Sequence, residues 1–407
     1  MGLLINSLGS GLVFPFMSLY LNGKLNFSMT EVGTIFALYS ATSIISQLVG
    51  GSLVDRIGRK PIMLFSLYGV AVGTTVLGLS SSLIGSSGLA RIVMVGVVVL
   101  LLGLTGAAFN PAVNAMVADL VESHQRTQAY GLIRIVTNLG VAIGPAIGGV
   151  IASRSYLLLF MLSAVASVVY GVIITLFVRE TRPTLPNASK ATSTSTSQKT
   201  GMGAIFSDRI FLTFNMLYLC STMVYAQMNT TLPVYLKQGF GVSESWYGLL
   251  MSLNAAMVVL FQFPLTHWLS RYARGKMMAL GMLLFAVGFG MFGFVSVLPL
   301  FFLAQAIWTT GEMVASPVAQ AFVADAAPVE RRGIYMGFYG LMWGVGYGLG
   351  PLFGGLVMDQ GNGRVIWYAA IGINLAVMLG FLIFNRRMQA RLENLEKQIV
   401  AKAAIVE

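Results

Sequence analysis

Residues 140–149 read GVAIGPAIGG, and residues 346–355 repeat the pattern as GYGLGPLFGG. Each copy places glycines and one proline at matching positions, namely Gly140, Gly144, Pro145, Gly148 and Gly149 in the first and Gly346, Gly350, Pro351, Gly354 and Gly355 in the second. The same offset superposes Pro111 on Pro317, Asp119 on Asp325, and Arg126 on Arg332 without a gap. The chain is therefore an internal duplication, in which each copy accounts for about half of the sequence.

The composition requires a membrane. The 407 residues are 56% hydrophobic and 10% charged, with a mean hydropathy of +0.80, whereas soluble domains carry about 25% charged residues. A helix needs about 20 apolar residues to cross the hydrocarbon. Apolar windows predict twelve such helices, near 3–21, 31–54, 61–80, 91–119, 126–151, 155–178, 210–236, 244–269, 274–297, 299–325, 332–357 and 364–386.

These helices predict two six-helix bundles, 1–180 and 210–387, joined by a cytoplasmic linker, 181–209. The linker contains a Ser/Thr run too polar and simple to pack. A tail helix is expected over 388–407, with an apolar face that either lies on the inner leaflet or belongs to a solvated helix. Most of the 25 Lys and Arg residues fall on the side that carries both termini. The positive-inside rule then predicts a multi-pass protein of the cell membrane with both termini in the cytoplasm.

The chain has few of the residues that catalytic and metal sites use, which disfavours several classes of function. One Cys and two His leave little for a metal site or thiol chemistry, and one deep acid does not make a catalytic set. The net charge of +11 is explained by cytoplasmic loops rather than by nucleic acid. We therefore expect no enzyme activity, cofactor, metal or nucleic-acid partner. The expected partners are the lipid bilayer, a small-molecule substrate and protons, and we expect a monomer.

The loop between the second and third predicted helices reads GSLVDRIGRKP over residues 51–61. It resembles the G-x-L-x-D-R-x-G-R-K signature of the major facilitator superfamily, and every defining position matches. Together with the glycine–proline motif, the whole chain resembles the twelve-helix drug:proton antiporters, the bacterial multidrug-resistance exporters. The resemblance implies an all-α fold of two pseudo-symmetric six-helix bundles that works by alternating access.

The resemblance also implies a conformational latch on the cytoplasmic side. Gly51 would let its helix approach a neighbour closely, and Asp55 would face the N-terminus of helix 332–357. Arg59 is then available to Asp119. The latch residues are Gly51, Asp55, Arg56, Gly58, Arg59, Lys60 and Asp119, although positive-inside anchoring suits Arg56 and Lys60 better. The matching loop 269–276 has no acid, which predicts a one-sided latch, and the two glycine–proline motifs are expected to form the moving interface.

Two ionisable residues fall well inside predicted spans, Arg134 and Glu312. Such a charge costs at least about 2.5 to 3.5 kcal/mol on the insertion scale. Burial favours the neutral form of Glu312, as a proton carrier requires, and structural pairing with a polar neighbour is the alternative. Arg134 would attract an anionic substrate, pair with Glu312 or snorkel to the inner surface.

In this superfamily the first, fourth, seventh and tenth transmembrane helices line the central cavity. The second, fifth, eighth and eleventh lie beside them. Polar and aromatic residues in these helices are therefore substrate-binding candidates. For each aromatic residue, the alternative is a purely structural role, facing the lipid or packing in the core. The candidates are Arg134, Asn6, Tyr39, Phe109, Asn110, Asn114, Asn138, Tyr225, Asn229, Asn254, Trp308 and Trp343.

The leading prediction is proton-coupled efflux of amphipathic small molecules or drugs. A transporter of a narrower substrate (a sugar, metabolite or lysolipid) is the alternative within the class. A transport-inactive membrane sensor is the alternative from another class, and its latch would be degenerate in both halves.

Overall fold

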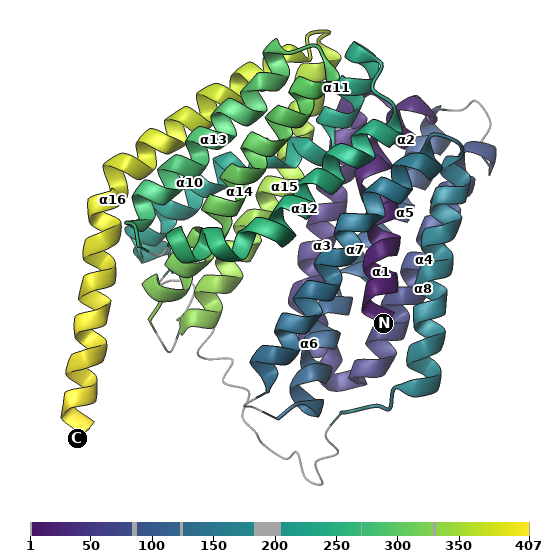
Figure 1. The fold of residues 1–407 in the computed structure, drawn as a ribbon. Coiled ribbons are helices and arrows are strands. Elements are labelled where there is room, and N and C mark those ends of the chain that lie inside the picture. Colours follow the sequence, from purple (N-terminus) through teal and green to yellow (C-terminus); the bar gives the residue numbers. More distant parts are fainter. Residues whose placement is uncertain are drawn as a thin grey trace. The chain divides into compact units, whose positions relative to one another are not determined.

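The computed structural model describes residues 2–83, 88–122, 125–182, 205–269, 271–328 and 331–406, and these form helices with no strand. Twelve helices in this described part are long and apolar enough to cross a membrane. The predicted fold class, an all-α protein with twelve transmembrane helices, is confirmed (Figure 1). Most of the predicted linker lies outside the described residues.

The first half supplies six membrane crossings. They are α1 (Gly2–Val13), η1 (Phe14–Phe16) and α2 (Met17–Gly23); α3 (Met29–Ile57); α4 (Arg59–Leu83); α5 (Gly88–Gly106) and α6 (Phe109–Leu120); α7 (Arg126–Ala152); and α8 (Tyr156–Phe177).

The second half repeats this order. Its crossings are α10 (Arg209–Tyr225), η2 (Ala226–Asn229) and α11 (Thr231–Phe240); α12 (Glu244–Leu269); α13 (Arg274–Phe294); α14 (Leu298–Ala326); α15 (Arg332–Asp359); and α16 (Arg364–Val406). The predicted bounds agree to within a few residues except at the breaks and at the last helix.

Three crossings that the sequence predicts as single helices are broken. Each break lies at or just before a proline: Pro15 in η1, Pro111 after the α5–α6 turn, and Pro233 after η2. Proline lacks an N–H and clashes with the carbonyl of residue i−4, so the helix opens there. Four other prolines, including Pro145 and Pro351, stay inside continuous helices.

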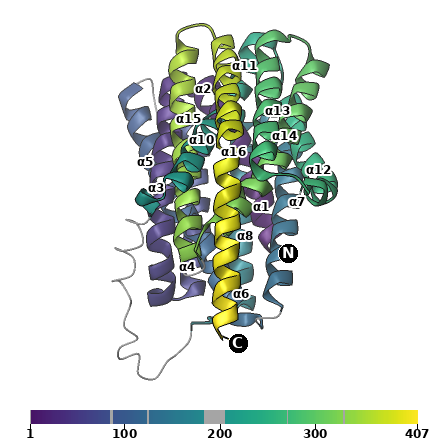
Figure 2. The same cartoon turned by 90° about the vertical axis from the view of Figure 1, so that its left-hand side faces the viewer.

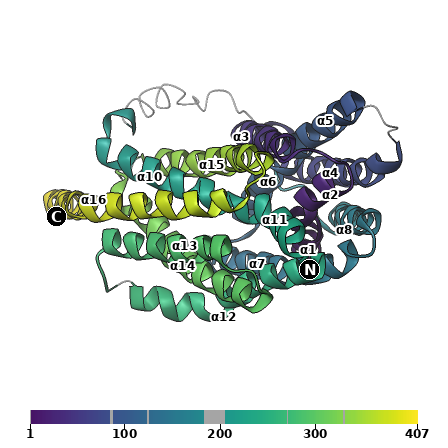
Figure 3. The ribbon, with the colours of Figure 1, turned by 90° about the horizontal axis from the view of Figure 1, so that it is seen from above.

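The last helix is longer than predicted. The predicted tail, 388–407, continues from the last crossing, because α16 runs for 43 residues without a break at 387 (Figure 2). Seen from above, α16 passes between α10 and α13 and packs on both (Figure 3).

The chain forms two compact units that do not coincide with its two repeats. Unit 1 comprises Met1–Thr184, Ala226–Val259 and Tyr347–Gly363, and unit 2 comprises Leu185–Tyr225, Leu260–Gly346 and Arg364–Glu407. In unit 1, α1 packs on α7 and α8, and α4 packs on α5 and α8. In unit 2, α13 packs on α14 and α16. The helices of the seventh, eighth and eleventh crossings are each divided between the units.

Candidate functional site

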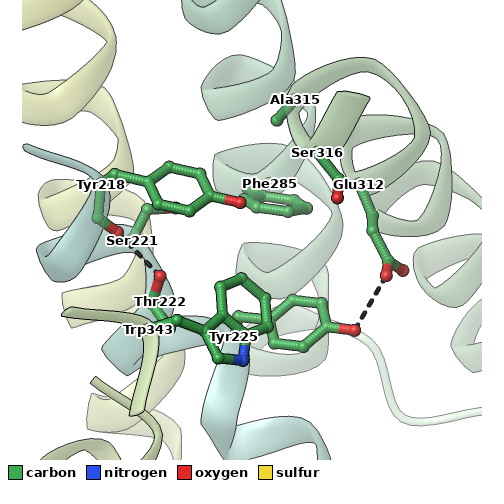
Figure 4. A pocket seen from close by; sticks show the side chains of 9 residues that line it. All are labelled: Tyr218, Ser221, Thr222, Tyr225, Phe285, Glu312, Ala315, Ser316 and Trp343. Atoms are coloured by element: carbon green, nitrogen blue, oxygen red, sulfur yellow. Dashed lines mark hydrogen bonds between the residues drawn. The ribbon is translucent and has the colours of Figure 1, made fainter. Parts of the chain in front are cut away.

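A cavity inside unit 2 gathers polar and aromatic side chains from two main helices. One face of α10 supplies Tyr218, Ser221, Thr222 and Tyr225, whose spacing of three and four residues places them on a single helical stripe. Glu312, Ala315 and Ser316 lie on the facing stripe of α14, with Phe285 from α13 and Trp343 from α15 (Figure 4). Of these nine residues, the sequence predicted Glu312, Tyr225 and Trp343. The polar stripe on α10 was a signal that could have given the others.

Glu312 points toward the hydroxyl of Tyr225, which donates a hydrogen bond of 2.9 Å to its carboxylate (Figure 4). The carboxyl group is at membrane depth because α14 is an apolar crossing. A half-buried acid at this depth gains from such a partner, since an unsatisfied polar group in an apolar medium is costly. The expected pairing of Glu312 with a polar neighbour is therefore present, and it leaves the proton-site hypothesis open, because a hydroxyl can bond to either form of a carboxyl.

Aromatic rings form much of the cavity wall. The Tyr225 and Trp343 ring centroids are 5.4 Å apart, and those of Tyr218 and Trp343 are 6.0 Å apart. The open space between these side chains is small, about 10 Å³, roughly the room that one water molecule needs. Drug-sized ligands need roughly 300–1,000 Å³, so these side chains must move apart before the cavity can enclose a ligand.

Two of the predicted aromatic contacts lie in the packed interior instead. Trp308 is fully buried, where it stacks on Phe289 and lies edge-on to the Tyr225 ring. Phe109 is buried in the core of unit 1 against Tyr170, with ring centroids 5.8 Å apart. Both residues therefore have the alternative role, packing in the core.

The remaining candidates lie in unit 1. The Asn229 side chain is buried and donates a 2.7 Å hydrogen bond to the Tyr347 hydroxyl. Tyr39 contacts the Phe14 ring. Arg134 is exposed on α7, as are Asn110 and Asn114 on α6, and the half-buried candidates are Asn6, Asn138 and Asn254.

The latch loop of unit 1 contains a short ion pair. The Arg59 side chain, 9% exposed, donates from Nε to Asp119 at 2.8 Å, and its Nη2 lies 3.4 Å from Asp55. The structure thus brings Arg59 and Asp119 together as the sequence analysis expected; their role as a latch stays a prediction. Gly51 is different: a Cβ there would meet no atom within 4 Å, whereas Gly50 faces Ala108. Gly51 is therefore not a close approach within its unit.

Glu180 contacts the loop motif 51–61 and was not predicted from the sequence. Its carboxylate accepts hydrogen bonds from the backbone N–H groups of Arg59 and Lys60, each 3.0 Å, and so caps the first turn of α4. Partial burial by itself raises the pKa of Glu180, but these bonds and those from the Arg182 and Thr181 N–H groups lower it below the ordinary value of 4.5. No sequence motif marks Glu180, because it follows α8 and is 121 residues from Arg59 along the chain.

The second half contains an ion pair that matches the one between Arg59 and Asp119. Arg274, the first residue of α13, pairs with Asp325 in the last turn of α14, as Arg59 at the start of α4 pairs with Asp119. The ion pair is therefore present in both halves, and the expectation of a one-sided latch, which rests on the missing acid, stays a prediction. The second copy lacks a counterpart of Asp55, but an arginine at the start of the helix still reaches the aspartate.

The glycine–proline motifs contact two kinds of neighbour. In the first copy, a Cβ on Gly140 or Gly144 would meet atoms of α1 at 2.5 and 2.8 Å, and one on Gly148 would meet Leu12 O at 2.8 Å. The second copy matches this, since Gly346 and Gly354 lie against α10 and the η2–α11 segment, and Gly350 O accepts a bond from Gln227. Most of the motif therefore packs within its own repeat rather than against the other.

The last glycine of each motif contacts the other repeat within unit 1. A Cβ on Gly149 would meet Glu244 O of α12 at 2.5 Å, and one on Gly355 would meet Met29 O of α3. The prolines do the same, since Pro145 O faces Gly248 and Pro351 O faces Gly33. Glu244 is also buried between two repeats, where it accepts bonds from Tyr156 and Lys237.

A duplicated protein that crosses the membrane twelve times, with a carboxyl in a cavity wall at membrane depth, has the architecture of a secondary transporter. The sequence profile described as Major Facilitator Superfamily matches residues 1–246 and 216–406. The chain belongs to this superfamily, and the resemblance drawn from its loop and repeat motifs is confirmed.

Relatives of similar length support the assignment. The chain is 29% identical to the uncharacterized MFS-type transporter YttB of Bacillus subtilis, covering 96% of this chain and 95% of YttB. It is 26% identical to a Na(+), Li(+), K(+)/H(+) antiporter of Planococcus maritimus (91% and 90% covered) and 24% identical to the multidrug resistance protein MdtH of Escherichia coli (95% and 93%). The crystal structure of the nucleoside transporter NupG has the same fold, with a TM-score of 0.76, 15% identity, and 94% and 97% of the two chains covered.

Proposed function

We propose that this protein is a proton-coupled antiporter that exports amphipathic small molecules or drugs by alternating access. The observation that carries the proposal is Glu312, a carboxyl at membrane depth that bonds to Tyr225 in an aromatic-walled cavity. Polar or charged residues inside the membrane mark substrate and ion pathways. The names of MdtH and of the cation/proton antiporter agree with export in exchange for protons.

The cavity favours ligands that carry a positive charge next to an apolar ring. Glu312 would attract the charge, and the faces of Tyr218, Tyr225 and Trp343 would add cation–π attraction. A proton arriving at Glu312 removes the negative charge, so proton and cation compete for one group. This competition would couple an inward proton to an outward ligand, with the membrane potential contributing about 2.3 kcal/mol per charge per 100 mV.

The experiment uses purified protein in sealed vesicles with an imposed pH gradient. Glu312→Gln should retain binding of an aromatic cation, through the rings, but lose its pH-driven transport. Thr310→Ser, on the same helix but outside the cavity lining, is the matched control and should keep both. Undiminished pH-driven transport by Glu312→Gln would overturn the proposal.

Other ligands are outcomes of the same experiment. Transport of Na⁺, Li⁺ or K⁺ but of no organic ligand would assign the function that the Planococcus relative's name gives. A thermal-shift panel of sugars, metabolites and lysolipids at two pH values tests the narrower substrates. Ligand binding without any transport would favour the membrane sensor.

We place the protein in the cell membrane with both termini in the cytoplasm. The charge distribution supports this orientation, because the loops on the side of the termini hold most of the Lys and Arg residues. The ends of the helices that carry Met29, Glu244 and Asp359 are then the outer ends.

A further inference from the structure

Asp359 holds the N-terminus of a helix from the other repeat. It is the last residue of α15, and its two carboxylate oxygens accept hydrogen bonds from the Met29 and Thr30 backbone N–H groups, at 2.8 and 2.7 Å. Met29 and Thr30 are the first two residues of α3. All of these residues belong to unit 1.

The contact completes the cap of α3. The first N–H groups of a helix have no partner within the helix. Ser28 and Glu31 form a capping box, in which Glu31 N donates to the Ser28 hydroxyl and Ser28 N donates to the Glu31 carboxylate. The two remaining donors, Met29 and Thr30, are served by Asp359. The positive end of the α3 dipole also favours a carboxylate there.

Small residues bring the two helices into backbone contact beside Asp359. A Cβ on Gly355 would overlap Met29 O, and one on Gly33 would overlap Pro351 O. Further along, a Cβ on Gly348 would meet Ser40 Cβ at 2.9 Å. We call the surface formed by Gly33, Ser40, Gly348 and Gly355 the α3–α15 seam.

In the pseudo-symmetric contact, between α7 and α12, the end of α7 supplies no carboxylate. The position that corresponds to Asp359 in the repeat is Ser153, whose hydroxyl lies 3.5 Å from that of Ser245. The glycine contacts are therefore duplicated, but the carboxylate from the end of the facing helix is not, since the acid at the α7–α12 contact is Glu244 of α12 itself, which bonds to Tyr156 and Lys237.

We infer that Asp359 is an outer latch, which fastens the end of α15 to the N-terminus of α3 and must be released for the outer side to open. Asp55, in the last turn of the same α3, is 73% exposed. It is the residue that the sequence analysis expects at the N-terminus of the helix that is now α15. A carboxylate near each end of this antiparallel pair would then be engaged in alternate states, Asp359 when the outer side is closed and Asp55 when the inner side is closed.

The test measures how often the seam opens. Cys220, the exposed native cysteine, is replaced by Ser, and Ser40→Cys provides a reporter in the seam. A membrane-impermeant maleimide is added to the outer side of intact cells. Asp359→Asn should speed the labelling about tenfold, because loss of a charge-assisted cap at this level shifts an equilibrium by about that ratio. Asp55→Asn should slow it.

A latch predicts that Asp359→Asn and Asp55→Asn change the labelling rate in opposite directions, whereas general loosening of the fold would speed labelling in both. Glu31→Gln weakens the capping box of α3 without touching α15, and should leave the labelling rate within about twofold of the parent, because a box bond is local. If Asp359→Asn does not fold, Gly355→Ala tests the same seam, since its new methyl group forces α15 away from Met29 and should also speed labelling. Unchanged labelling in the variant that folds, an equal effect of Glu31→Gln, or faster labelling in Asp55→Asn would overturn the inference.

Discussion

Gly58 shows why the latch loop has the residues it has. Its backbone φ is +122°, a conformation that L side chains rarely adopt, and a Cβ there would lie 2.6 Å from Glu180 Oε2. A side chain at this position would add strain of about 1–3 kcal/mol and displace the carboxylate that caps α4. The glycine of the motif is therefore a condition of the Glu180 cap.

Glu180 should make stability depend on pH. Its pKa in the folded protein lies below the ordinary value of 4.5, so the ionised carboxylate stabilises the fold fully above that value. This stabilisation is lost as the pH falls through the folded-state pKa. Thermal unfolding in detergent should show a larger fall in Tm between neutral pH and about pH 3 for the parent than for Glu180→Gln.

The effect should be small, because the Glu180 side chain is largely solvated and its interactions are screened. Glu393→Gln, on the exposed surface of α16, is a suitable control and should follow the parent curve. Equal pH dependence in the parent and in Glu180→Gln would show that the four backbone bonds do not stabilise the fold.

At the scale of helices, α7 depends on glycine where it crosses α1. A Cβ on Gly144 would lie 2.8 Å from the Gly11 backbone, whereas one on Gly131, earlier in the same helix, would meet nothing within 4 Å. Gly144→Ala should therefore destabilise the protein by about 1–3 kcal/mol through overpacking. Gly131→Ala should stabilise it by up to about 1 kcal/mol, because alanine loses less backbone entropy. Thermal unfolding of the two variants in the same detergent measures the difference, and a similar Tm for both would contradict the close approach.

Helix breaks show where sequence reasoning succeeds and fails for elements. The apolar windows predict the crossings well, because a membrane fixes their length. Breaks at Pro15, Pro111 and Pro233 were not predicted, while Pro145 and Pro351 remain inside helices. In a membrane, neighbouring helices can restore the lost partners of a proline, so the outcome depends on tertiary contacts that residue order does not show.

At the scale of the molecule, the duplicated ion pairs differ in their surroundings. The Arg59 and Asp119 side chains are 9% and 22% exposed, and those of Arg274 and Asp325 are 30% and 50% exposed. Breaking a buried pair costs roughly 3–5 kcal/mol, and an exposed pair contributes about 0–1 kcal/mol. Arg59→Ala should therefore lower the Tm much more than Arg274→Ala does. Equal losses would mean that the two pairs are equivalent in energy.

The same comparison shows how much of the site the sequence could provide. Arg59 and Asp119 were predicted as partners because a repeated motif and a known signature mark both. Tyr225 and Glu312 were predicted separately, and their hydrogen bond was not, because it joins helices 87 residues apart. Asp359 has no motif, and its role depends on the positions of two backbone N–H groups that side-chain patterns do not reveal.

The length of α16 has a practical consequence. A helix of 43 residues is about 65 Å long, roughly twice the 30 Å hydrocarbon layer. The helix is therefore longer than one crossing needs, and it stays continuous although it bends along its course (Figure 1). A compact soluble protein fused in helical register after this helix would be carried as a rigid marker, large enough to orient particles of this small membrane protein in electron cryo-microscopy.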